Sequence, residues 1–263
     1  SVSTLGLGLG YNEDLMSGLA SAGSGNHIFV EEEEDLVAVF NNEFNDLMSV
    51  VAGDFKIHAR VARGIRPVRV LGTNADIMGQ DVYIPLAQLY ASQQRYFVLE
   101  VEVDASESGT ARQLVTVSVE YQNMITETTD KLTSTVNVRF TESVADVEKD
   151  LDHETYAFCA VQIANERNIR ATALRDAGQI DEAKKLLNKN VDELHKFAEI
   201  CKENDVELVV PELQQSIEVN RYQVELVESA DWNRSRKEMR AAQNEVQSQQ
   251  TKLRSQSKLN IGN

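Results

Sequence analysis

The sequence has few cysteines and no long hydrophobic run, and both features limit what the chain can be. Its 263 residues include only two cysteines, Cys159 and Cys201, too few for the disulfide framework of a small secreted domain. No apolar run approaches the roughly 20 residues of a membrane span, and no charged-then-apolar signal segment opens the chain. We therefore predict a soluble, cytoplasmic protein without a membrane span, in which both cysteines remain thiols.

Positive charge is also scarce, and it is unevenly placed. The chain has 26 basic against 42 acidic residues, for a net charge of −16. Most of its surface would therefore repel a phosphate backbone, which argues against a non-specific nucleic-acid binder. The exception is the C-terminal end, where seven lysines and arginines and only two glutamates follow Trp232.

Three patterns of hydrophobic spacing divide the chain, and 42% hydrophobic residues suffice for globular cores. Residues 1–52 have the pattern strand, helix, strand, helix, typical of one edge of an α/β domain. Residues 53–142 alternate in six short stretches, which predicts an antiparallel β-sandwich. Residues 143–206 predict a helical hairpin that turns at Gly178, and residues 207–263 a last helix with a frayed basic tail. The second helix of the first part is marked by apolar residues at helical spacing: Leu36, Val39, Phe40, Phe44, Leu47 and Val51.

Three glycines near the beginning, in "LGLGLGYNEDL", raise the question of a phosphate site. Gly6, Gly8 and Gly10 alternate, whereas a dinucleotide fingerprint needs G-x-G-x-x-G and a P-loop needs a following Gly-Lys-Ser/Thr. Glu13 and Asp14 also place carboxylates in the first helical turn, where a phosphate would otherwise bind. A nucleotide-binding or enzymatic subunit that uses this turn is kept only as an alternative hypothesis.

The stretch "VSTLGLGLGYNEDLMSGLASAGSGNHIFVEEEEDL" resembles the closing strand and helices of a von Willebrand factor type A (VWA) domain. The form it resembles occurs in bacterial proteins related to inter-alpha-trypsin inhibitor heavy chains and to calcium-activated chloride channels. The segments "IPLAQLYASQQRYFVLEVEV", "ALRDAGQIDEAKKLL" and "RKEMR" are similar to that family's β-domain, helical hairpin and basic C-terminal helix. The resemblance implies a multidomain α+β protein in which residues 1–52 are the C-terminal edge of a doubly wound VWA domain. The first half of that domain, covalent or associated, would be one partner.

The resemblance also bears on metal binding. Family VWA domains hold Mg²⁺ or Ca²⁺ through an Asp-x-Ser-x-Ser loop, a Thr and an Asp, and all three loops would precede Ser1. It therefore implies no metal and no other cofactor in this chain. Asp104, Ser106 and Ser108 have the same spacing, but they lie between two alternating strands, so we predict a solvated hairpin loop there.

The resemblance implies a protein-binding or scaffolding function rather than catalysis. Adhesion would depend on metal if the upstream half carries the metal site; the alternative is a metal-independent scaffold that acts through the helical region and basic tail. On the last helix, an apolar pair would enter a groove while neighbouring basic residues pair with acidic ones. The acidic surface would belong to this chain, to another protein or to a neighbouring copy in a homo-oligomer. The candidate partner-binding residues are Trp232, Arg236, Lys237, Met239 and Arg240.

Overall fold

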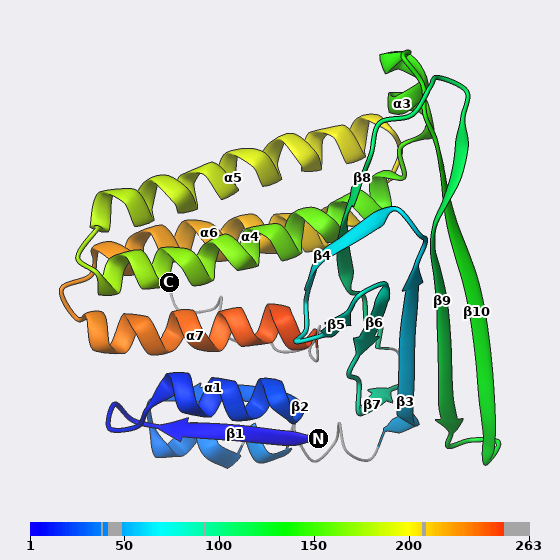
Figure 1. The fold of residues 1–263 in the computed structure, drawn as a ribbon. Coiled ribbons are helices and arrows are strands. Elements are labelled where there is room, and N and C mark those ends of the chain that lie inside the picture. The colour runs from blue at the N-terminus through cyan, green and yellow to red at the C-terminus, as the bar shows by residue number, and fades with distance from the viewer. Residues whose placement is uncertain (38, 42–48, 92, 207–208, 250–263) are drawn as a thin grey trace.

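The computed structural model describes residues 1–37, 39–41, 49–91, 93–206 and 209–249 (Figure 1). Figure 1 shows three parts side by side: a small β-α-β unit, a group of long helices above it, and a set of strands that stands against both. The last helix lies between the other long helices and the β-α-β unit. The last described helix therefore packs against the N-terminal elements of the chain.

The β-α-β unit consists of β1 (Val2–Leu7), α1 (Glu13–Ala22) and β2 (Ser24–Val30). The two strands run parallel. The side chain of Asn12 caps α1 by accepting a hydrogen bond from the Leu15 amide at 3.0 Å. At Gly25 the strands approach so closely that a Cβ atom would overlap the Val2 carbonyl, so glycine is required there. A short 3-10 helix, η1 (Glu33–Asp35), follows.

The second helix predicted for the N-terminal part does not extend to Val51. Val51 lies inside the strand β3 (Val50–Val61) and not on a helix. Its carbonyl accepts a hydrogen bond from the Met124 amide at 3.0 Å, so pairing with other strands outweighs the helical spacing at this point. Phe40 is 63% exposed, while Phe44 and Leu47 lie outside the described residues.

The β-rich part contains one large sheet and one small sheet. The large sheet has the order β10-β9-β3-β6-β5, with β7 also paired to β3, and β4 pairs with β8 in the small sheet. Each of the six stretches predicted to alternate contains a strand. Both sheets contribute to one apolar cluster that includes Val61, Ile65 and Val82. The remaining strands are β4 (Ile65–Leu71), β5 (Asp76–Met78), β6 (Asp81–Ile84), β7 (Gln88–Tyr90), β8 (Val98–Val103), β9 (Ala111–Asn123) and β10 (Thr128–Arg139).

The segment that carries Asp104, Ser106 and Ser108 does not form the predicted hairpin loop. It joins β8 to β9, and these strands pair with different neighbours, β8 with β4 and β9 with β3 and β10. The prediction was wrong because two consecutive alternating strands can belong to different sheets, and alternation alone does not assign partners.

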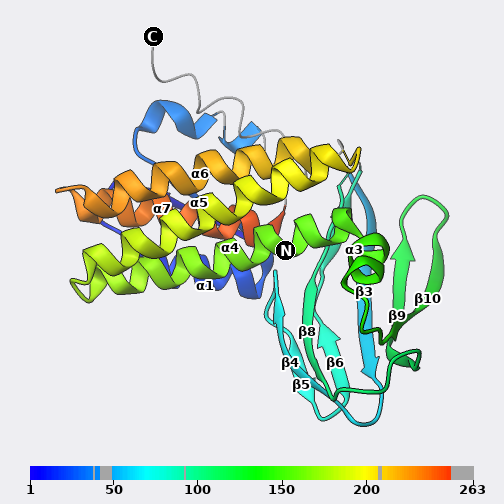
Figure 2. The same ribbon diagram turned by 90° about the horizontal axis from the view of Figure 1, so that it is seen from above.

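The C-terminal half is helical (Figure 2). Gly178, at φ +78°, lies in the turn between α4 and α5 as predicted. The helices that follow do not stand apart from this hairpin, because α4, α5 and α6 share one apolar cluster and Met239 of α7 joins a second. At the end of the last helix, Ser248 is 8% exposed and donates a hydrogen bond to Asn26 Oδ1 at 2.9 Å. Residues 250–263 lie outside the described residues. The helices are α3 (Val144–Asp150), α4 (His153–Asp176), α5 (Ile180–Glu203), α6 (Val210–Glu228) and α7 (Trp232–Ser248).

Amide side chains occupy the centre of the helical part. The Nδ2 atom of buried Asn190 lies 2.9 Å from Asn168 Oδ1 and 3.1 Å from Asn220 Oδ1. Such contacts link three helices and satisfy polar groups that would otherwise be costly to bury. None of the described helices is both long and apolar enough to cross a lipid bilayer.

Candidate functional site: a charged clasp between the first and last helices

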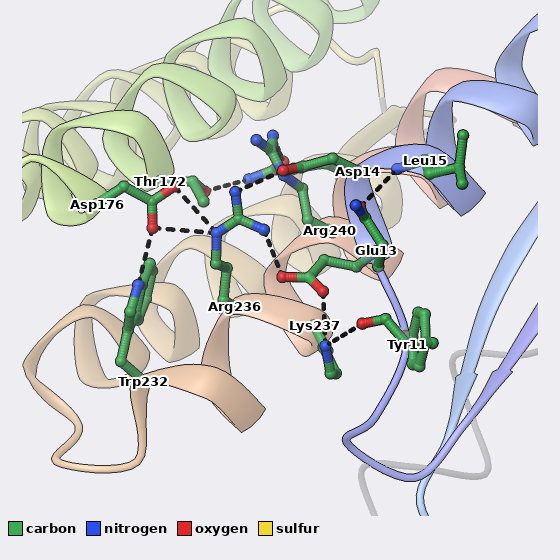
Figure 3. Close-up of polar contacts among 12 residues, drawn as sticks. Tyr11, Glu13, Asp14, Leu15, Thr172, Asp176, Trp232, Arg236, Lys237 and Arg240 are labelled. Carbon is green, nitrogen blue, oxygen red and sulfur yellow. Dashed lines mark hydrogen bonds and ion pairs between the residues drawn. The ribbon is translucent and has the colours of Figure 1, made fainter.

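The most concentrated group of charged side chains in the described structure lies between α1 and α7 (Figure 3). One side of α7 inserts Met239 into the apolar cluster of the helices. Another side carries basic residues that meet the first turn of α1. We call this group of six residues the clasp: Glu13, Asp14, Asp176, Arg236, Lys237 and Arg240.

Arg236 contacts three carboxylates from two parts of the chain. Its guanidinium is ion-paired with Glu13, lies 2.7 Å from Asp14 Oδ2, and lies 3.0 Å from Asp176 Oδ2 at the end of α4. Arg240, one helical turn later, lies 2.9 Å from Asp14 Oδ1. The planar guanidinium suits this task because it presents several donors in fixed directions. Arg236 therefore joins α1, α4 and α7 at one point.

Lys237 is the most deeply buried member of the clasp, with 1% of its side chain exposed. Its Nζ donates to Glu13 Oε2 at 2.6 Å and to the Tyr11 carbonyl at 2.9 Å, and it lies 4.5 Å from the centre of the Tyr11 ring. A buried ammonium group is costly unless it is paired and hydrogen-bonded. Here the carboxylate, the carbonyl and the ring face together meet that requirement.

The basic residues of the clasp keep its carboxylates on α1 in the charged form. Burial alone would raise the pKa of Glu13, but hydrogen bonds from Lys237 and Arg236 outweigh it and hold that pKa below its usual value. For Asp14, burial acts in the same upward direction and is likewise outweighed, here by Arg236 and Arg240. These hydrogen bonds to the charged form keep both carboxylates ionised.

A buried histidine lies beside the clasp. His27 of β2 is 3% exposed, and its Nδ1 lies 3.0 Å from Thr4 Oγ1 on β1. Burial lowers the pKa of His27 to about 4, with Glu13 acting in the opposite direction. The imidazole is therefore neutral at pH 7. Tyr11 covers it edge-on, with ring centres 5.8 Å apart, and burial raises the pKa of Tyr11 to about 12.

The clasp accounts for the glycine turn that precedes α1. A Cβ atom at Gly6 would overlap the Tyr11 ring, so this glycine makes room for an aromatic side chain. The first turn of α1 carries Glu13 and Asp14, and their charges are balanced by cations of α7. The helix end that a phosphate would need is thus occupied by the chain's own carboxylates.

All five predicted partner-binding residues contact other parts of the same chain. Trp232 donates from Nε1 to Asp176 Oδ1 at 2.8 Å, and Met239 is completely buried. Arg236, Lys237 and Arg240 reach α1. The acidic surface that they meet is therefore the N-terminal β-α-β unit of the same chain, one of the alternatives considered above.

Sequence reasoning missed the acidic half of this site. We interpreted Glu13 and Asp14 only as carboxylates that occupy the first helical turn in place of a phosphate, and we assigned no role to Asp176. The available signal was charge complementarity: adjacent carboxylates at one end of an acidic chain and closely spaced cations at the other. With more than 220 residues between them, nothing local identifies the pairing.

Among the described residues, no group of three or more His, Cys, Asp or Glu side chains could hold a metal ion. Ser106, in the Asp-x-Ser-x-Ser segment, instead accepts a hydrogen bond from the Arg112 guanidinium at 3.5 Å. The segment leads into strand β9 and not into a helix.

A parallel β-α-β unit that packs against α7 on one side, next to an antiparallel β-rich part, makes this a mixed α/β fold. No family model and no curated protein matches the sequence. Among solved structures, the chain is similar to a von Willebrand factor type A protein from Catenulispora acidiphila, with a TM-score of 0.59 and 15% identity over 80% of this chain and 50% of that one. It is also similar to VWA2, the ArnB paralog from Sulfolobus acidocaldarius, with a TM-score of 0.52 and 15% identity over 94% and 56% of the two chains.

These similarities show a VWA-like fold. The chain spans about half the length of the solved structures that it matches.

Proposed function

We propose that this chain is part of a protein-binding or scaffolding VWA protein, of the type related to inter-alpha-trypsin inhibitor heavy chains and calcium-activated chloride channels. The observation that carries the proposal is the part of the surface of the β-α-β unit that no other described element covers. Its sheet has two parallel strands, whereas parallel sheets normally have more strands and are covered on both faces. Leu15 and Leu19 on α1 are 59% and 49% exposed, and Leu7 and Leu9 are also exposed.

Further strands of the VWA sheet would pair with β1 and cover these side chains. Binding of other proteins would then take place at the completed domain, and it would depend on Mg²⁺ or Ca²⁺ if the added strands bring an Asp-x-Ser-x-Ser loop. The clasp favours this arrangement over binding through the basic face of α7. Since Arg236 and Lys237 already hold acidic groups of the same chain, an external partner at α7 would have to displace them.

In this proposal the 263-residue chain is not catalytic and works in the cytoplasm. The clasp would have a supporting role, in which it holds the β-α-β unit against the helices so that added strands join a fixed edge. The metal-independent alternative keeps the same architecture but uses the helical surface as the scaffold.

Hydrogen exchange tests the proposal. We would compare the β1 amides, residues 2–7, in the 263-residue chain and in the full-length protein that its gene encodes. Added pairing should slow their exchange by about tenfold or more, while the amides of β9 keep the same rates as an internal control. Equal β1 exchange in the two proteins would contradict the proposal that β1 joins a larger sheet.

A further inference from the structure

The outer edge of β10 is unpaired in the described structure. β10 is the terminal strand of the large sheet and pairs only with β9. It has 12 residues, about twice the usual strand length. Across the described residues, no hydrogen bond outside the β9 ladder reaches the backbone of residues 128–139. Figures 1 and 2 both place β10 at the outer border of the molecule.

The charged residues of β10, Asp130, Lys131 and Arg139, lie on either side of residues 132–138. This central part of the edge lacks the features by which proteins usually prevent edge-to-edge pairing. Such features are charged side chains, prolines and bulges on the edge strand. Residues 132–138, "LTSTVNV", contain no charge, no proline and no glycine. The single register shift in the β9–β10 ladder comes from an extra residue, Leu114, on β9, so β10 itself continues without interruption.

The apolar face of the sheet continues onto β10 and is uncovered there. Leu132 is opposite Val119 of β9, and Val136 is opposite buried Val115. Even so, Leu132 and Val136 are 59% and 49% exposed. The strand therefore offers both an unpaired backbone and an apolar pair of side chains on one face.

We infer that β10 pairs with β10 of a second copy of this chain, antiparallel and with the twofold axis at Ser134. In this register Leu132 faces Val136 of the other copy and Thr133 faces its Thr135. Both are favourable cross-strand pairs. Lys131 faces the uncharged Asn137, so no like charges are opposed. The large sheets of the two copies become one continuous sheet.

The two neighbouring symmetric registers, with the axis moved by one residue in either direction, are less suitable. A twofold axis at Thr135 places Lys131 opposite Arg139 of the other copy, and like charges directly opposite each other are destabilising. An axis at Thr133 places Leu132 opposite Ser134 and Asp130 opposite Val136, so the apolar contact is lost. Closed twofold pairing needs a residue to face its own copy. Of these three positions, Ser134 is the one that keeps the contact between Leu132 and Val136 and opposes no like charges.

The interface is a single strand pair with few side-chain contacts, so the dimer is weak and reversible. It uses a surface apart from β1, α1 and α7. The inference therefore does not rest on the proposed function, and either can fail without the other.

Two substitutions at one exposed position test the register. Asn137→Glu places a carboxylate opposite Lys131 of the other copy, twice per dimer, and should tighten dimerisation by about three- to tenfold. Asn137→Lys opposes like charges and should weaken it by a similar factor. Sedimentation equilibrium of the whole chain measures both, and because the two variants change the same exposed side chain, each is the other's control for folding.

Disulfide trapping locates the axis. In the inferred dimer the two Ser134 Cα atoms lie about 5 Å apart, within reach of a disulfide, so Ser134→Cys should form covalent dimers on oxidation. The two Val138 positions are separated by about 27 Å, so Val138→Cys should give no more dimer than the wild type. A wild-type chain that stays monomeric at all concentrations would overturn the inference, as would equal trapping of the two variants. A monomeric chain that instead binds an unrelated extended peptide at β10 would assign the edge to a different partner, which also overturns it.

Discussion

Glu13→Gln is the substitution that most sharply tests the energetics of the clasp. It keeps the shape of the side chain and removes the negative charge that Arg236 and Lys237 share. Arg236 retains Asp14 and Asp176. Lys237, 1% exposed, is left with an amide, a carbonyl and a ring face. Removal of one partner from a buried pair costs about 3–5 kcal/mol, and we expect about 3 kcal/mol here because Arg236 keeps its other partners.

The chain contains one tryptophan, Trp232, which donates a hydrogen bond to Asp176 of the clasp. Its fluorescence during urea unfolding therefore reports on this region. Lys237→Met in the Glu13→Gln background should recover part of the loss, since no unpaired ammonium then remains in the interior. The exposed Glu34→Gln serves as the control and should change stability by less than about 0.5 kcal/mol. If Glu13→Gln behaves like Glu34→Gln, or if its cost simply adds to that of Lys237→Met, the reasoning is refuted.

Three further outcomes are expected. The folded-state pKa of His27 is lowered to about 4 from 6.5, so the neutral imidazole contributes about 3 kcal/mol to the free energy of unfolding above about pH 6.5, and this is lost as pH falls towards 4. In urea unfolding at pH 7 and pH 5, the free energy of unfolding should therefore change less with pH in His27→Gln than in the wild type. An equal change in both proteins would exclude His27 as the cause. Gly25→Ala forces a Cβ against the Val2 carbonyl and should speed amide exchange in β2 but not in β9; unchanged β2 exchange would contradict the close strand approach. Calorimetric titration of the 263-residue chain with Mg²⁺ should show no saturable binding, whereas binding that Asp104→Ala abolishes would restore the Asp-x-Ser-x-Ser segment as a metal site.

Local patterns were sufficient to predict many elements of this fold. Alternation of apolar and polar residues in "VRV" and "VTVSVEY" predicts strands because one face is wet and one dry, and β4 and β9 contain these residues. Gly178 stops α4 because only glycine adopts its positive φ without strain. These are properties of neighbours in the chain, so the sequence displays them directly.

Contacts between distant segments were harder to predict. Val51 follows helical spacing but joins a strand, because β7 and β9 offer backbone partners to that segment. The segment from Asp104 to Ser108 links two sheets, since strand partners are chosen in three dimensions. The acidic half of the clasp was missed for the same reason. Lys237 was a candidate for binding a partner, and only the folded chain places Glu13 against it.

Helix α7 holds the β-α-β unit in place through the clasp. Hydrogen exchange of Arg236→Ala tests it most directly, because this one side chain contacts Glu13, Asp14 and Asp176. We predict faster exchange in α1 and β2 than in the wild type, with the amides of β9 and β10 unchanged. Wild-type exchange rates throughout α1 and β2 would contradict the claim, and so would an equal acceleration in β9 and β10.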